Sequence, residues 1–230
     1  MENITFNLAQ LHKYGSAFYD FLGLRKRFFV DQLGWQIPHD DDVEMDQYDN
    51  PTAYYSLALR DGEVVGGARV MATTAKWGSH TYMLRDAVAG KLIGIPADIL
   101  PKADATANVW EVTRVVISDE VTTGAERSEC LSLMLDGAIG VARKQGATEL
   151  MSLSPLAMAR TLRKLGYDAV RIGDPYRNAE DGRRYACVSM PTVPSAINRR
   201  KSDTLNVIPS QVPRATHVPQ QLPVHAPSVI

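Results

Sequence analysis

The stretch YYSLALRDGEVVGGARVMAT, from Tyr54 to Thr73, decides the fold of this chain. It contains two apolar, strand-like runs joined by Asp61-Gly62. A two-residue Asp-Gly link between such runs is a strong signal for a β-hairpin. The pair Gly66-Gly67 inside the second run predicts either a bulge or the close approach of another part of the backbone.

The elements around this hairpin complete an α/β pattern. Apolar periodicity and turn residues predict helices over residues 14–33, 126–145 and 156–165, and strands over residues 109–118, 148–153 and 185–190. Between residues 76 and 108 the pattern is irregular, and we expect a long excursion with one short helix. This order predicts a three-layer αβα fold around a mixed, twisted, mainly antiparallel sheet.

Composition limits the class of protein. The chain has 230 residues, a formal net charge of −1 and 45% hydrophobic residues, enough for one sizeable core. The near-neutral charge argues against a nucleic-acid partner. Two cysteines suit a reducing compartment, and we see neither a signal peptide nor a membrane span, so we expect a cytoplasmic protein.

The last forty residues differ from the rest. Residues 191–230 hold seven of the 13 prolines and show no hydrophobic periodicity. We therefore predict one folded domain over residues 1–190, followed by a Pro-rich, disordered tail.

An acidic loop follows the first predicted helix. Its carboxylates are Asp40, Asp41, Asp42, Glu44, Asp46 and Asp49. Unpaired carboxylates are too costly to bury, so we expect the loop to lie outside the core. It is either a solvated surface or one wall of a site for a cationic, partly apolar small molecule.

Charged residues also interrupt two predicted central strands. Arg69 lies in the hairpin, and Glu111 and Arg114 lie in VWEVTRVV. They form either a structural ion network with the loop carboxylates or part of a functional cleft. Strict alternation would place Glu111 and Arg114 on opposite faces of the sheet. If both serve one cleft, a β-bulge must lie between them, and regular pairing through Val112 and Thr113 would contradict this prediction.

Other kinds of site have little support. Ser152 and Ser154 have no His or Asp at triad spacing, and the five histidines are too scattered for a metal site. There is no phosphate-binding loop of the Walker or dinucleotide type. Two predicted helices carry a basic stripe made up of Arg143, Lys144, Arg160, Arg163 and Lys164. This stripe is either a solvated face or a binding surface for an acidic carrier protein.

Taken together, these residues resemble the acyl-homoserine lactone synthases of bacterial quorum sensing. The resemblance covers residues 1–190 and rests on an Arg, Phe and Trp at the first helix, an E-x-D-x-x-D loop, a strand Arg and a later E-x-x-R. In this sequence the matching residues are Arg25, Phe29, Trp35, Glu44, Asp46, Asp49, Arg69, Glu111 and Arg114.

The resemblance implies a GNAT-like acyltransferase fold and a reaction between two substrates. Such enzymes transfer an acyl group from an acyl carrier protein, or in some members from acyl-CoA, to S-adenosylmethionine. It implies no cofactor beyond that substrate, and no metal.

Residue roles follow from the same resemblance. Carboxylates and aromatic faces suit a sulfonium cation, so Asp46, Asp49, Phe29 and Trp35 would surround it. Arg25 and Glu44 join them as substrate-binding residues. Glu111, or Asp46 through a water, would take the proton of the α-amine, and Arg69 and Arg114 would hold the cleft closed. Ser152 lies where relatives that prefer 3-oxo chains tend to have Thr, so as a substrate-binding residue its hydroxyl would bond a 3-oxo group of the acyl chain; the alternative is a strand-end Ser that pairs with the backbone.

Two rival functions remain at this point. A GNAT N-acetyltransferase acting on another amine would have a glycine-rich turn for the CoA pyrophosphate, whereas the sequence there is DEVTTGAERSEC. The other rival is a non-catalytic module that binds a small ligand.

Overall fold

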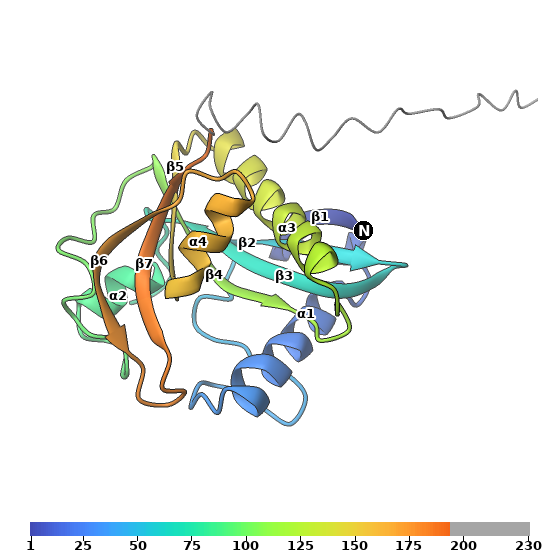
Figure 1. Ribbon diagram of the computed structural model, residues 1–230, viewed down its shortest axis with the longest axis horizontal. Coiled ribbons are helices and arrows are strands. Elements are labelled where there is room, and N and C mark those ends of the chain that lie inside the picture. Colours follow the sequence, from blue (N-terminus) through green and yellow to red (C-terminus); the bar gives the residue numbers. More distant parts are fainter. Residues whose placement is uncertain (194–230) are drawn as a thin grey trace, which may run out of the picture.

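A seven-stranded sheet runs through the computed structural model, which describes residues 1–193 (Figure 1). The strands are β1 (Glu2–Asn7), β2 (Ala53–Arg60), β3 (Glu63–Ala72), β4 (Val109–Ile117), β5 (Glu149–Pro155), β6 (Val170–Arg177) and β7 (Arg184–Pro191). The helices are η1 (Leu8–Lys13, 3-10), α1 (Ala17–Arg25), η2 (Lys26–Gln32, π), α2 (Met83–Val88), α3 (Gly124–Lys144) and α4 (Leu156–Lys164).

The predicted hairpin is confirmed. Strands β2 and β3 pair in antiparallel fashion around Asp61 and Gly62, whose φ angles of 55° and 86° suit a tight hairpin turn. The register shifts opposite Val65, next to Gly66. A Cβ on Gly67 would lie 2.5 Å from the ring of Phe21 in α1. The reading of the glycine pair as a bulge is therefore correct, whereas the close approach at Gly67 is that of side chains and not of backbone.

The sheet is split at its centre. The strand order is β1-β2-β3-β4-β5-β7-β6, and every neighbouring pair is antiparallel except β4 with β5. The parallel pair is short, because β4 bonds β5 only from Val109 to Glu111, although β4 continues to Ile117. Beyond Glu111 the two strands are no longer paired, and this gap shapes the site described below.

Helices cover both faces of the sheet, as predicted (Figure 1). Helices α3 and α4 bury one face through residues such as Met134 and Leu162. Helices α1 and α2 bury the other face, with Phe21 and Leu84 among the residues in that core. The three-layer αβα arrangement is thus confirmed, and the one short helix expected in the long excursion is α2.

The sequence did not reveal the two edge strands. Strand β1 is a short run at the start of the chain, and β6 contains Gly173 and Pro175, which obscure its strand pattern. The tail predicted for residues 191–230 lies, from residue 194 onward, outside the described residues. No helix within residues 1–193 is long and apolar enough to cross a membrane.

Candidate active site

Arg25, at the end of α1, forms the fully buried part of an ion cluster with two loop carboxylates. Its guanidinium donates from Nη1 and Nη2 to the two carboxylate oxygens of Asp49, both at 2.8 Å, and from Nε to Glu44 Oε2 at 2.6 Å. None of the three side chains is exposed. Tyr55 from β2 adds a hydrogen bond to Asp49 Oδ1 at 3.1 Å.

Two further arginines complete the cluster from the central strands. Arg69 of β3 donates to both oxygens of Asp46 and lies 3.0 Å from Asp49 Oδ2. Arg114 of β4 lies 2.8 Å from Asp46 Oδ2 and binds both oxygens of Glu44. Three guanidinium groups therefore face three carboxylates, and their formal charges balance.

This balance explains how the loop carboxylates can be buried. Burial alone would raise the pKa of Asp49, but the charges of Arg69 and Arg25 outweigh it and hold that pKa well below its usual value. Burial also tends to raise the pKa of Asp46, but the charges of Arg69 and Arg114 outweigh it and lower that pKa. The expectation that the whole loop lies outside the core is wrong for Glu44 and Asp49 and holds for residues 40–42, which are exposed.

The bulge in β4 is present but displaced by one residue from the prediction. Pairing with β3 stays regular through Val112 and Thr113, which contradicts the predicted place. The extra residue comes next, where Arg114 and Val115 together oppose one residue of β3. Arg114 has a φ of 53°, and this left-handed turn brings its side chain to the face that holds Glu111.

Glu111 lies apart from the ion cluster. Its two carboxylate oxygens accept the backbone N–H groups of Met83 and Leu84, each at 2.8 Å, so it fixes the first turn of α2. Burial raises its pKa to about 7, although those two hydrogen bonds act in the opposite direction. The pKa of this carboxyl group therefore lies near neutral pH, unlike the lowered pKa values of Asp46 and Asp49.

A cleft of about 530 Å³ opens beside the cluster. Four of the predicted site residues line it, namely Phe29, Trp35, Asp46 and Arg114. The predicted residues that lie behind its wall are Arg25, Glu44, Asp49, Arg69 and Glu111. The residues predicted from the sequence therefore include both those that line the cleft and those that support its wall, but the sequence did not show which residues belong to which group.

The aromatic side of the cleft begins in the π-helix η2. A π turn is a rare geometry that is common at functional sites, and here it follows directly on Arg25. Phe29 from η2 stacks on Trp35, with ring centroids 5.0 Å apart and planes at 27°. The guanidinium of Arg114 lies over Phe29 at 5.4 Å. This wall offers a cation a π face next to the carboxylate of Asp46.

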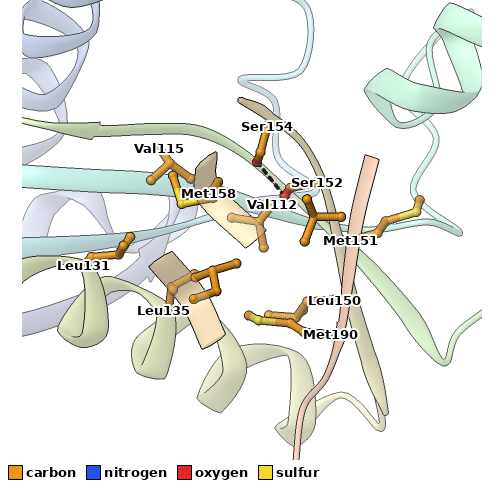
Figure 2. A pocket seen from close by; sticks show the side chains of 12 residues that line it. Val112, Val115, Leu131, Leu135, Leu150, Met151, Ser152, Ser154, Met158 and Met190 are labelled. Atoms are coloured by element: carbon orange, nitrogen blue, oxygen red, sulfur yellow. Dashed lines mark hydrogen bonds between the residues drawn. The ribbon is translucent and has the colours of Figure 1, made fainter. Parts of the chain in front are cut away.

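A small apolar pocket lies between β4 and β5, and Figure 2 shows the side chains that line it. Its volume is about 20 Å³, and it shares Val112, Val115, Ser154 and Met158 with the cleft. Ser152, a predicted binding residue, lines this pocket, and its hydroxyl lies 2.8 Å from that of Ser154. Apart from these two hydroxyl groups, the lining of the pocket is apolar.

Several residues of the site carry no recognisable signal in the sequence. Thr113 accepts a hydrogen bond from Arg69 Nε at 3.0 Å, and Tyr55 binds Asp49. Asp181, in the turn between β6 and β7, accepts the indole N–H of Trp35 at 3.0 Å. Only the proximity created by the fold identifies these partners.

Comparisons with known proteins agree with this geometry. The family model described as autoinducer synthase matches residues 10–195. The acyl-homoserine-lactone synthase of Acinetobacter nosocomialis is 36% identical over 163 residues, 67% of this chain and 82% of the relative. That of Ralstonia nicotianae is 33% identical over 154 residues, 65% of this chain and 70% of the relative.

Solved structures of similar fold include members of the same group. TofI in a ternary complex with an inhibitor and MTA aligns with a TM-score of 0.65 and 28% identity, over 84% of this chain and 92% of TofI. The AHL synthase LasI aligns with a TM-score of 0.68 over 83% of this chain and 89% of its own; at 20% identity this likeness concerns the fold alone. The expected GNAT-like fold is confirmed.

Proposed function

Because this chain belongs to the autoinducer synthase family, we propose that it makes an N-acyl-L-homoserine lactone for quorum sensing from S-adenosylmethionine and an acyl thioester, with release of methylthioadenosine. The observation that carries the proposal is the pairing of a charge-balanced arginine–carboxylate cluster with an aromatic cleft. The TofI structure named with MTA, 28% identical, supports the same acceptor.

The acceptor fits the side of the cleft formed by Phe29, Trp35 and Asp46. A sulfonium carries a positive charge with apolar substituents, so π faces and one carboxylate are suitable neighbours. Asp46 is held in place by two arginines and contributes a fixed negative edge. Asp49, which was expected beside the cation, supports Arg25 and Arg69 from behind instead.

Acyl transfer requires the α-amine to lose a proton. The amine nitrogen attacks the thioester carbonyl, a C–N bond forms, the C–S bond breaks, and the thiol leaves with a proton. We favour Glu111 as the base over Asp46, because a pKa of about 7 suits proton uptake near neutral pH, whereas two arginines weaken Asp46 as a base. Glu111 lies behind Met83, a lining residue, so the proton reaches it through a bridging water.

Lactone formation follows on the same acceptor. The methionyl carboxylate attacks its own γ-carbon, a C–O bond forms, the C–S bond of the sulfonium breaks, and methylthioadenosine leaves. The sulfonium is already a good leaving group, so this step depends on positioning. We propose no cofactor, and we place the reaction in the cytosol, where the two free cysteines, Cys130 and Cys187, stay reduced.

We place the acyl chain in the cleft, with its end directed toward the small pocket between β4 and β5, which at about 20 Å³ has room for one small group. The acyl chain would pass Met158 and Val115, which line both cavities, and end among apolar side chains from α3, α4 and β7. The hydroxyl pair of Ser152 and Ser154 would then lie beside the chain and offer a hydrogen bond to an oxygen on its third carbon.

An acyl carrier protein is the donor that we favour over acyl-CoA. The N-terminus of α3, where related folds bind the CoA pyrophosphate, is already capped by Thr123 and carries Glu126 in its first turn. A carboxylate there repels an anion. Helix α4 exposes Arg160 and Lys164, which suit an acidic carrier protein.

Mass spectrometry tests the activity first. Extract from a heterologous bacterial host that produces this chain should contain a compound with a homoserine-lactone fragment ion, and its parent mass gives the acyl group. Extract from a host with Glu111→Gln should lack it. Amide formation at the normal rate by Glu111→Gln, with only lactone closure lost, would contradict the assignment of the base.

The donor is tested with purified protein. We expect a higher kcat/KM with an acyl group on acyl carrier protein than with the same group on CoA. Arg160→Glu should lower kcat/KM with the acyl carrier protein, and this effect should be smaller at high salt. Lys13→Glu, an equal change of charge on η1, is the control. Acetyl-CoA used on another amine would instead indicate an N-acetyltransferase, and binding of S-adenosylmethionine without turnover would indicate a binding module.

A further inference from the structure

Two aromatic side chains of the cleft wall bind the same carboxylate. Asp181 Oδ2 accepts the indole N–H of Trp35 at 3.0 Å and the phenol O–H of Tyr185 at 2.6 Å. Its other oxygen accepts the backbone N–H of Arg183 at 2.9 Å. Trp35 and Tyr185 both line the cleft, whereas Asp181 does not.

A second contact joins the same two segments. The backbone N–H of Gln36 donates to Glu180 Oε1 at 3.0 Å, next to the Trp35–Asp181 bond. Residues 35 and 36 follow the first helix, and residues 180 and 181 belong to the β6–β7 turn, so the two contacts connect opposite ends of the folded chain.

The turn that holds Asp181 is itself well ordered by hydrogen bonds. The N–H of Asn178 donates to Arg183 O at 2.9 Å, and that of Gly182 donates to Asn178 O at 3.0 Å. The side-chain oxygen of Asn178 accepts the N–H of Glu180 at 2.7 Å. Asp181 therefore stands on a fixed support, while Trp35 is half-buried and follows the end of a helix.

The orientation of Trp35 determines the shape of the aromatic wall. Its ring stacks on Phe29 at 27° and meets Tyr185 edge to face, with centroids 6.0 Å apart. Tyr185 in turn packs against Tyr176 at 6.2 Å. Stacking tolerates rotation of the ring in its own plane, whereas a hydrogen bond from the indole nitrogen fixes that rotation.

We propose that Asp181 is a positioning residue for the acceptor half of the site: it fixes the ring of Trp35 against Phe29 and holds the β6–β7 turn over the cleft. The proposal rests on the proposed function, because the ligand placed against this wall is the S-adenosylmethionine cation. Asp181 touches neither the reacting atoms nor the acyl pocket, so its effect falls on acceptor binding.

Steady-state kinetics of Asp181→Ala provides the test. Loss of the charge-assisted bonds to Trp35 and Tyr185 should raise KM for S-adenosylmethionine about tenfold and leave KM for the acyl donor within about twofold. Asp174→Asn, an exposed carboxylate on the neighbouring strand β6, should leave both values unchanged. An equal rise of both KM values for Asp181→Ala would overturn the proposal.

A double-mutant cycle separates positioning from a general loss of structure. Trp35→Phe keeps a stacking ring but removes the N–H, and it should reproduce most of the KM change by itself. Asp181→Ala should then add little in the Trp35→Phe background, because the shared bond is already absent. Full additivity of the two effects would overturn the proposal, and Trp35→Phe alone still tests it if Asp181→Ala does not fold.

Binding and fluorescence give a result that does not depend on turnover. Calorimetry should show about tenfold weaker binding of S-adenosylmethionine to Asp181→Ala, and the emission assigned to Trp35 should move to longer wavelength as water reaches the ring. If the wild type binds this ligand but makes no lactone, the proposed function fails while the role of Asp181 remains tested. Unchanged binding and emission would refute that role.

Discussion

The side chains of Arg25 and Asp49 form a two-point ion pair, 2.8 Å at each contact, with no exposed surface on either one. Such a pair contributes little net stability when it is intact, because both charges must be desolvated. Its loss from one side is different, since the remaining charge stays buried without a partner. The pair therefore makes the acidic loop depend on α1.

Arg25→Met should lower the free energy of unfolding by about 3–5 kcal/mol, because Asp49 and Glu44 lose a buried counter-charge. Urea denaturation followed by circular dichroism measures this change. Lys26→Met is the matched control. Its pair with Asp31 is partly exposed, so we expect a change within about 1 kcal/mol. Equal losses of stability for the two variants would show that burial of the Arg25 ion pair does not increase the cost of removing one partner.

The raised pKa of Glu111 predicts an unusual dependence of stability on pH. The carboxyl titrates near 4.5 in the unfolded chain and near 7 in the folded protein. Between these values the unfolded chain has lost the proton that the folded protein retains, so the free energy of unfolding falls as pH rises. The contribution of this one group should fall by about 3 kcal/mol from pH 4.5 to pH 7 and then stay constant.

The comparison with Glu111→Gln isolates that contribution. The stability of wild type minus that of the variant should decrease between pH 5 and pH 7.5. The lowered pKa values of Asp46 and Asp49 act in the other direction, since they add stability above pH 4 that is lost as the pH falls, but they are common to both proteins and cancel. A difference that does not vary with pH would mean that Glu111 titrates normally.

Gly67→Ala should destabilise the protein by about 1–3 kcal/mol. A methyl group there meets the ring of Phe21 at 2.5 Å and a methyl of Leu57 at 2.6 Å, so α1 must move away from the sheet. Gly140→Ala in α3 provides the contrast. Nothing lies within 4 Å of a Cβ at that position, and we expect a gain of about 0.5–1 kcal/mol from helix propensity. Thermal unfolding of both variants measures the two changes in stability. A loss of stability for Gly140→Ala, or no loss for Gly67→Ala, would contradict the prediction.

Met158 should control the length of the acyl chain, because it lines both the cleft and the small pocket. Met158→Trp narrows the passage and should shift the products toward shorter chains, while Met158→Ala should admit longer ones. A series of acyl donors of increasing length, with products measured by mass spectrometry, gives the preference of each variant. An unchanged preference in both would place the chain elsewhere.

Sequence by itself determined the central hairpin, the main helices and the layer order, because these features depend on local periodicity and on turn residues such as Asp61 and Gly62. It also pointed to charged and aromatic residues that the fold gathers at the cleft, since charges in apolar strands and the spacing of a family pattern are both visible in a linear chain. The edge strands β1 and β6 were missed because short strands with irregular composition have little local signal.

Only the tertiary structure determined the position and the partners of each of those residues. Contacts between distant segments determine which carboxylates pair with Arg25. Such contacts also place Glu111 at the first turn of α2 and the bulge at Arg114. The bond between Trp35 and Asp181 joins residues 146 positions apart. Local sequence carries no record of such pairs, because their energies arise only when the fold brings the partners together and removes water from between them.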